Sequence, residues 1–189
     1  MPMIRECIVT TSNAEGEIHI APLGLIEDGG NWIVAPFHPS TTLKNLRENP
    51  FAVANFTDDV LIFAGCLTGR KDWPTVPADE VPGARLAETL AHMELAVDRI
   101  EEDELRPRFS CRVVKTVNHA PFGGMNRAKS AVLEAAILAS RLKMLPREKV
   151  DQEIDYLTIA IEKTAGPRER EAWDLLMAKI DAFYRNAAE

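Results

Sequence analysis

The sequence predicts an α+β, mainly β, protein in which a small antiparallel barrel precedes a C-terminal helical subdomain. Up to about residue 118, short apolar and β-branched runs alternate with turn residues, as is typical of antiparallel strands. Beyond residue 124, apolar side chains recur every three or four positions, which is the period of amphipathic helices. We therefore assign residues 1–118 to the barrel and residues 119–189 to the helical subdomain.

The first strands form a hairpin over residues 6–25, because the segment 13–16 has the composition of a tight turn. In the segment 108–114, apolar and polar residues alternate, so one face of this strand should be buried. The remaining strands are expected at 32–35, 51–56, 60–64 and 94–100. Short helices are expected at 42–48 and 84–92, and a loop at 71–83.

Three helices in tandem are expected after residue 126. The first covers 127–145 and ends at Pro146, which also begins the second. Pro167 begins the third helix. The apolar stripes of these helices are interpreted as the core of an antiparallel helical bundle rather than as part of a cofactor site.

Composition excludes several classes of protein. The 189 residues carry a formal net charge of −7, and no basic run with interleaved aromatic residues occurs, so a nucleic acid is not an expected partner. No apolar stretch reaches the ~20 residues that span a bilayer. The N-terminus lacks the pattern of a signal peptide, so we expect a cytoplasmic protein. The three cysteines have no metal-ligand spacing, so they are interpreted as buried structural thiols, and no metal site is expected.

The segment 39–46, PSTTLKNL, is the strongest candidate for a binding site. It follows an expected strand and begins an expected helix with three consecutive hydroxyl groups, Ser40, Thr41 and Thr42. The free amides and the positive dipole end of such a helix attract anions such as phosphate. The alternative is that Ser40 or Thr41 merely caps the helix and binds nothing.

Two further motifs extend this candidate into a family resemblance. HIAPLG, at residues 19–24, precedes the hydroxyl-rich segment, and the segment 121–136 begins PFGGMNRAK. In this order and spacing, the motifs resemble those of the FMN-binding split-barrel superfamily, which includes flavin reductases and pyridoxamine-phosphate-oxidase-like proteins. The segment 121–136 is also similar to an uncharacterised split-barrel family of methanogens and C1-metabolising bacteria with a helical C-terminal part.

The resemblance implies an antiparallel split β-barrel, a homodimer, and FMN bound near the subunit interface. It places the phosphate on the hydroxyl-rich segment and Asn45, the isoalloxazine edge on Pro22, Leu23 and Gly24, and the ribityl chain or pyrimidine edge on nearby polar residues. The residues expected to bind FMN in this first group are Thr10, Thr11, Asn13, His19, Pro22, Leu23, Gly24, Ser40, Thr41, Thr42 and Asn45. Ordinary turn chemistry at Asn13 and a structural role for His19 are the alternatives.

A second group lies at the junction of the two parts, where ligand clefts often form. It comprises Asn118, His119 and Arg127. Arg127 and Lys129 fall in the first turn of an expected helix, where their charge opposes the dipole. This placement indicates either an anionic partner or a surface ion pair.

The function that follows from the resemblance is that of an FMN-dependent oxidoreductase or flavin reductase of unknown substrate. A nicotinamide or a deazaflavin is the expected electron donor, and any nicotinamide would bind transiently because the sequence has no dinucleotide-binding GxGxxG fingerprint. No side chain stands out as a catalytic acid or base. The alternative is therefore a non-catalytic dimeric module that binds flavin or a partner protein.

Overall fold

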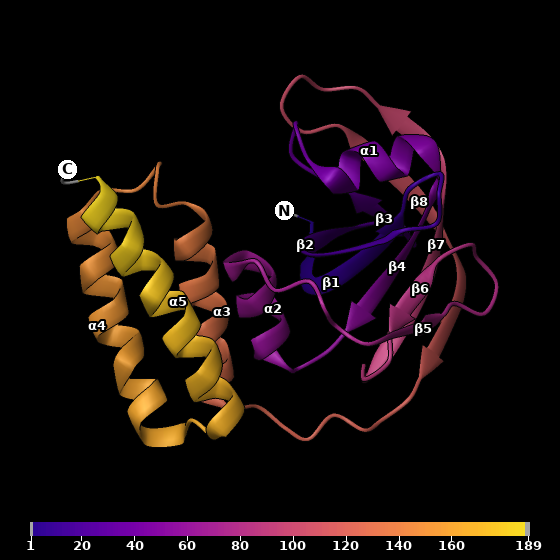
Figure 1. Ribbon diagram of the computed structural model, residues 1–189. Coiled ribbons are helices and arrows are strands. Elements are labelled where there is room, and N and C mark those ends of the chain that lie inside the picture. The colour runs from indigo at the N-terminus through magenta and orange to yellow at the C-terminus, as the bar shows by residue number, and fades with distance from the viewer. Residues whose placement is uncertain (1, 188–189) are drawn as a thin grey trace. The chain divides into compact units, whose positions relative to one another are not determined.

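A computed structural model describes residues 2–187, and six antiparallel strands close into a barrel in its N-terminal part (Figure 1). The strands follow one another around the barrel in the order β1-β2-β3-β8-β7-β4. Their bounds are β1 (Ile4–Ser12), β2 (Ile18–Asp28), β3 (Asn31–Val34), β4 (Phe51–Phe56), β7 (Ala91–Glu101) and β8 (Arg108–Asn118). The predicted antiparallel barrel with its two hairpins is thus confirmed.

The barrel interior is filled by alternate residues of these strands, as the period of two requires. Cys7, Val9, Leu95, Phe109 and Cys111 are buried in one apolar cluster. Burial raises the pKa of the Cys111 thiol to about 12, and burial together with the nearby Glu6 carboxylate raises that of Cys7 further. Both thiols therefore stay protonated and are structural, as predicted.

A short hairpin of β5 (Thr75–Pro77) and β6 (Ala84–Leu86) covers β1 and β4. The predicted helix at 84–92 is therefore wrong. The buried Asn55 side chain accepts a hydrogen bond from the Leu86 amide at 2.8 Å, and the Thr10 hydroxyl donates to the Ala84 carbonyl. These bonds to distant strands hold β6 extended, and sequence spacing alone gives no sign of them.

One short helix, α1 (Thr41–Glu48), lies on the barrel as predicted, and a second short helix was missed. The apolar segment predicted as a strand at 60–64 belongs to α2 (Val60–Thr68). The Asp59 side chain caps α2 by accepting from the Leu61 amide at 3.2 Å, and Gly69 ends it in the left-handed conformation with φ of 100°. A short apolar run has no period that separates a strand from a buried helix.

The C-terminal helices are α3 (Arg127–Ser140), α4 (Arg147–Thr164) and α5 (Pro167–Asn186). All three were predicted, although α3 ends five residues before the expected position, in a turn that precedes Pro146. Among the described residues, no helix has the length and apolar character that crossing a membrane requires.

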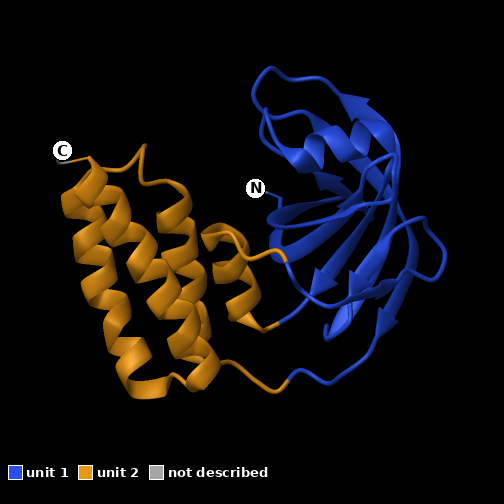
Figure 2. Cartoon of the chain, in the orientation of Figure 1, with its two compact units in different colours: residues 1–57, 72–122 blue, residues 58–71, 123–189 orange. Residues whose placement is uncertain are grey.

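The chain forms two compact units, which Figure 2 shows in different colours. One comprises residues 1–57 and 72–122, and the other residues 58–71 and 123–189. The helical unit thus contains α2 as well as residues 123–189. Within this unit, Asp58 pairs with Lys129 at 2.5 Å, and Asp59 pairs with Arg168.

Candidate functional site

The beginning of α1 is built around Ser40, which has an extended backbone and caps the helix. Its hydroxyl accepts from the Leu43 amide at 3.2 Å, and its carbonyl accepts from the Lys44 amide at 3.1 Å. The amides of Thr41 and Thr42 have no acceptor within a helix that begins there. Ser40 can therefore cap the helix while an anion binds the amides of Thr41 and Thr42, so the helix-cap and phosphate-site interpretations do not exclude each other.

The side chains of this segment differ in what they offer. Thr41 is exposed, whereas Thr42 and Asn45 are buried against the barrel. The Asn45 side chain donates to the Thr11 hydroxyl at 3.2 Å. Lys44 points into solvent and pairs with Glu48 at 3.6 Å, one turn further along α1, so its charge does not face the beginning of the helix.

The residues of the first hairpin that were expected to bind FMN lie on both faces of β1, because successive side chains of a strand point in opposite directions. Thr11 lies opposite His19 in the register of β1 and β2, and its bond to Asn45 brings both strands to α1. Thr10 points to the other face, where its hydroxyl donates a hydrogen bond to the Ala84 carbonyl of β6. Asn13 forms the predicted turn, because its side chain accepts from the Glu17 amide and donates to the Glu17 carboxylate, each at 2.8 Å.

Pro22, Leu23 and Gly24 occupy the middle of β2, opposite residues 6–8 of β1. A Cβ atom at Gly24 would lie 2.7 Å from the Ile4 side chain and 3.3 Å from the Glu6 carboxylate. The close packing against β1 therefore explains why a glycine stands at position 24, whether or not a flavin ring approaches it.

A hollow of about 620 Å³ near α1 is not suited to a phosphate. It is lined by His38, Arg47, Glu102, Asp103 and Glu104. The one arginine is paired with Glu102 at 2.7 Å, so the three acidic residues determine the charge of this hollow.

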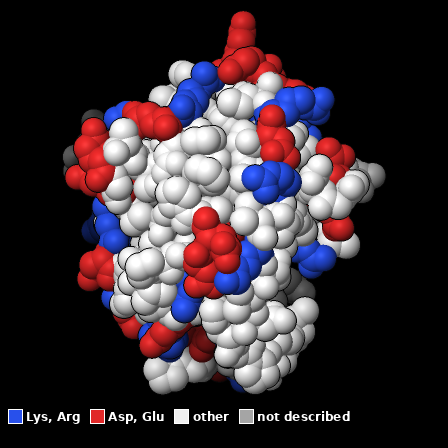
Figure 3. All heavy atoms as spheres, turned by 90° about the vertical axis from the view of Figure 1, so that its right-hand side faces the viewer, with Lys and Arg blue, Asp and Glu red and all other residues white. Residues whose placement is uncertain are grey.

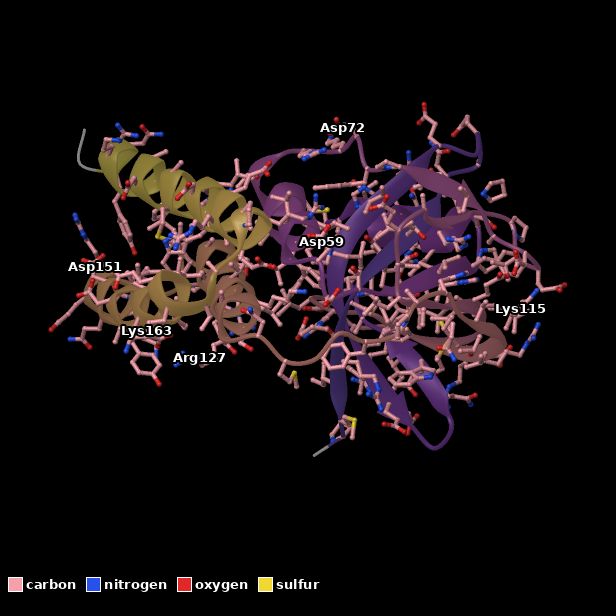
Figure 4. All side chains as sticks on the ribbon, turned by 90° about the horizontal axis from the view of Figure 1, so that it is seen from below. Asp59, Asp72, Lys115, Arg127, Asp151 and Lys163 are labelled. Atoms are coloured by element: carbon pink, nitrogen blue, oxygen red, sulfur yellow. The ribbon has the colours of Figure 1, made fainter. Side chains whose placement is uncertain are left out.

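Arg127 lies in the helical unit, exposed in the first turn of α3 (Figure 4). Asn118 is the last residue of β8, and His119 follows it. Within the helical unit, Asn126 caps α3, and the ion pair of Lys129 with Asp58 accounts for one of the two cations in its first turn. The predicted alternative of an ion pair is therefore correct for Lys129, whose partner is Asp58.

Sequence reasoning missed a buried polar cluster on β7. His92 and Glu94 are both fully buried, and His92 Nε2 lies 3.1 Å from Glu94 Oε1. His92 Nδ1 lies 2.8 Å from His119 Nε2 at the end of β8. The spacing His-x-Glu puts both residues on one face of a strand, which is the signal in the sequence that could have found them.

Glu94 is the anchor of this cluster. Burial alone would raise its pKa, but hydrogen bonds from the amides of Asp79, Glu80 and Val81 and from His92 hold the pKa below its ordinary value. The three amide bonds are 2.7, 2.8 and 2.9 Å long. The carboxylate is therefore ionised at neutral pH, and four donors surround it.

The same cluster contains the one group of possible metal ligands among the described residues, Asp79, His92 and Glu94, whose ligand atoms lie within 4.8 Å of one another. Each of these side chains is already engaged. Glu94 accepts from backbone amides, His92 is bonded at both ring nitrogens, and Asp79 pairs with Lys115 at 3.0 Å. We interpret the group as a hydrogen-bonded network.

The pKa of His119 is lowered from its ordinary 6.5, first by desolvation and then by the charges of Arg85 and His92, while Asp79 opposes the shift. We expect the substitution Arg85→Met to raise the pKa of His119 toward 6.5, because it removes a cation that disfavours protonation. An NMR titration of the imidazole protons measures this, with the exposed His38 as internal reference. An unchanged or lower pKa of His119 would contradict the assignment.

Comparison with known proteins follows the same division into two parts. A family described as "Protein of unknown function (DUF447) N-terminal domain" matches residues 5–120, and one described as "Protein of unknown function (DUF447)" matches residues 126–178. No match is found among proteins of curated function.

Among solved structures, an FMN-bound DUF447 protein from Methanosarcina mazei superposes with a TM-score of 0.81 at 20% identity, over 95% of this chain and 96% of that one. A 2-nitrobenzoate 2-nitroreductase from Pseudomonas fluorescens covers 63% of this chain and 66% of its own, with a TM-score of 0.53 and 20% identity. Component B of nitrilotriacetate monooxygenase from Bacillus cereus covers 69% and 77%, with a TM-score of 0.52 and 16% identity. These similarities establish the split-barrel fold.

Proposed function

The chain belongs to the DUF447 family, and from this premise we propose that it binds FMN on its barrel and acts as a flavin-dependent oxidoreductase or flavin reductase. The observation that carries the proposal is the FMN-bound relative from Methanosarcina mazei, which matches both parts of the chain. Solved structures that cover 63% of the chain include a nitroreductase and a flavoredoxin, which supports a redox function for this fold.

The residues at the beginning of α1 fit a phosphate group. The amides of Thr41 and Thr42 need acceptors, the exposed Thr41 hydroxyl is a further donor, and the helix dipole adds positive potential. We propose that these groups hold the FMN phosphate. Thr11 and Asn45 would then act by fixing α1 on β1 through their buried hydrogen bond.

The other expected contacts belong to the same proposal. Pro22 and Leu23 would lie along the flavin ring, with Gly24 beside them, and His19 would face the same end of the barrel as Thr11. Asn118 and His119 of the barrel unit remain proposed FMN contacts, and Arg127 of the helical unit is a separate proposal. We also propose a homodimer with FMN near the interface.

When bound, FMN supplies the hydride or electron transfer, and the protein positions the flavin and limits its contact with water. A nicotinamide or a deazaflavin is the proposed electron donor.

The surface charge does not favour a nucleic-acid partner. Figure 3 shows acidic and basic side chains interspersed on one face of the molecule, without the continuous basic stripe that such a partner would favour.

The activity is tested with the FMN-loaded protein under anaerobic conditions. We expect NADH, NADPH or a reduced deazaflavin to bleach the visible flavin absorbance over repeated turnovers once an electron acceptor is added. If dithionite bleaches the bound flavin but none of the three donors does, the protein is the non-catalytic flavin-binding module. Free FMN with the same donors is the control for reaction outside the protein.

A further inference from the structure

Glu94, His92 and His119 form a continuous hydrogen-bonded row from the outer face of the barrel wall to the surface. The His92 and His119 rings have centroids 5.0 Å apart and planes only 9° apart. With a nitrogen-to-nitrogen distance of 2.8 Å, the two rings lie nearly in one plane and are joined edge to edge. His92 and Glu94 are fully buried, whereas His119 is exposed.

The donors around Glu94, together with a neutral His92, set the direction of both ring hydrogen bonds in this row. An ionised carboxylate only accepts, so His92 Nε2 carries a proton and donates to Glu94. When His92 is neutral, its Nδ1 is an acceptor, and His119 Nε2 carries the proton between the two rings. In neutral His119, the lone pair is therefore on Nδ1, the nitrogen that the row leaves unused.

We propose that His119 is a general base whose tautomer is set by His92 and Glu94. Nδ1 of His119 takes a proton from a bound weak acid, and the proton on its Nε2 passes to His92 Nδ1. His92 is then an imidazolium beside the Glu94 carboxylate, and return of the proton along the same path restores the neutral row. Two proton transfers occur, the row gains one proton in total, and nothing is oxidised or reduced.

The charges around His119 indicate the class of substrate. The Arg85 guanidinium is held at the end of β6 by the carbonyls of Leu86 and Ala87, at 3.0 and 3.2 Å. Its charge lowers the pKa of His119, while Asp79, held by Lys115 of β8, acts in the opposite sense. A cation beside a base stabilises the anion that deprotonation produces. The substrate is therefore a small acid, such as a phenol or an enolisable carbonyl compound, whose conjugate base carries negative charge.

This role of His119 rests on residues of the barrel alone and goes beyond the proposed flavin chemistry. It is tested on the flavin-free protein, so that failure of FMN binding and failure of the relay are separate results. His92 and Glu94 are positioning residues, since they act only through His119.

The first test records imidazole N–H signals of the ¹⁵N-labelled chain at neutral pH. We expect a water-protected Nε2–H on His119 despite its exposure, and loss of that signal in the variant His92→Phe. The exposed His38 provides the unprotected reference. A rapidly exchanging His119 Nε2–H in the unmodified chain, or a signal that survives in His92→Phe, would overturn the relay.

If His92→Phe does not fold, the surface variant His119→Asn tests the same contact, because it should shift the His92 Nδ1 resonance. An unshifted resonance would contradict the contact.

Zn²⁺ tests the alternative that Asp79, His92 and Glu94 bind a metal ion. Removal of both Nε2–H signals by one equivalent of Zn²⁺ would make the cluster a metal site and exclude the relay.

The second test measures whether Nδ1 of His119 is open to reagents. Diethyl pyrocarbonate acylates neutral imidazole nitrogens, and peptide mapping assigns the modified histidines. We expect modification of His119 at neutral pH at least as fast as that of His38, while His92 stays unmodified. Protection of His119 in the folded protein would rule out its action as a base.

Discussion

Replacement of Glu94 by glutamine is expected to lower the free energy of unfolding by about 3 kcal/mol, a value typical of a lost buried charge with several hydrogen bonds. The carboxylate accepts from the amides of Asp79, Glu80 and Val81 and faces His92. A glutamine side chain has one acceptor oxygen, and its amide nitrogen would point at donors. The loop before β6 and the histidine row should both loosen.

Urea denaturation followed by circular dichroism measures this effect, and Glu101→Gln on the same strand is the matched control. Glu101 is 48% exposed and pairs with Arg99 and Arg108 at the surface, so its change should stay within ~0.5 kcal/mol. A Glu94→Gln variant as stable as Glu101→Gln would contradict the anchoring role of Glu94.

The pH dependence gives an independent signature of Glu94. Its folded pKa is lower than the value of 4.5 for the unfolded chain, so its contribution to stability is complete above 4.5 and is lost as the pH falls through the folded value. His119 adds a second loss below 6.5, since a lowered histidine pKa disfavours the protonated folded state. Glu94→Gln should remove the lower of the two pH effects.

The elements that the sequence predicts correctly are those with a clear period or clear turn chemistry. The hairpin of β1 and β2 follows from its turn at 13–16, and β8 follows from its alternation. The predictions at α2 and β6 were wrong because the local sequence there has no period that distinguishes a helix from a strand. The apolar α2 is set by its caps and by packing within the helical unit, and β6 by hydrogen bonds to Asn55 and Thr10.

Among the candidate site residues, those in one local motif were the easiest to place. Ser40 caps α1 as its position predicts, because capping depends on neighbouring residues alone. The row from Glu94 to His119 joins β7, β8 and the loop before β6, so only the fold brings its members together. Thr10 was expected beside Thr11, but neighbouring residues of a strand point to opposite faces, so the Thr10 side chain faces away from α1.

The second large effect concerns FMN. The double variant Thr41→Ala with Thr42→Val is expected to weaken FMN binding about 10- to 100-fold, which corresponds to the loss of one charge-assisted hydrogen bond. Thr41 is exposed at the start of α1, and valine keeps the volume of the buried Thr42. The matched control is Lys44→Ala, because Lys44 points outward and pairs with Glu48 on the same helix.

The most direct measurement is a titration of the purified flavin-free protein and these two variants with FMN, followed by flavin fluorescence and the visible spectrum. We predict saturable binding of one FMN per chain, retained in Lys44→Ala and weakened at least 10-fold in a folded Thr41→Ala/Thr42→Val variant, the lower bound for a lost charge-assisted bond. Binding that is equally tight in all three proteins would remove the phosphate from the beginning of α1. An unmodified protein that leaves both flavin signals unchanged would contradict FMN binding itself.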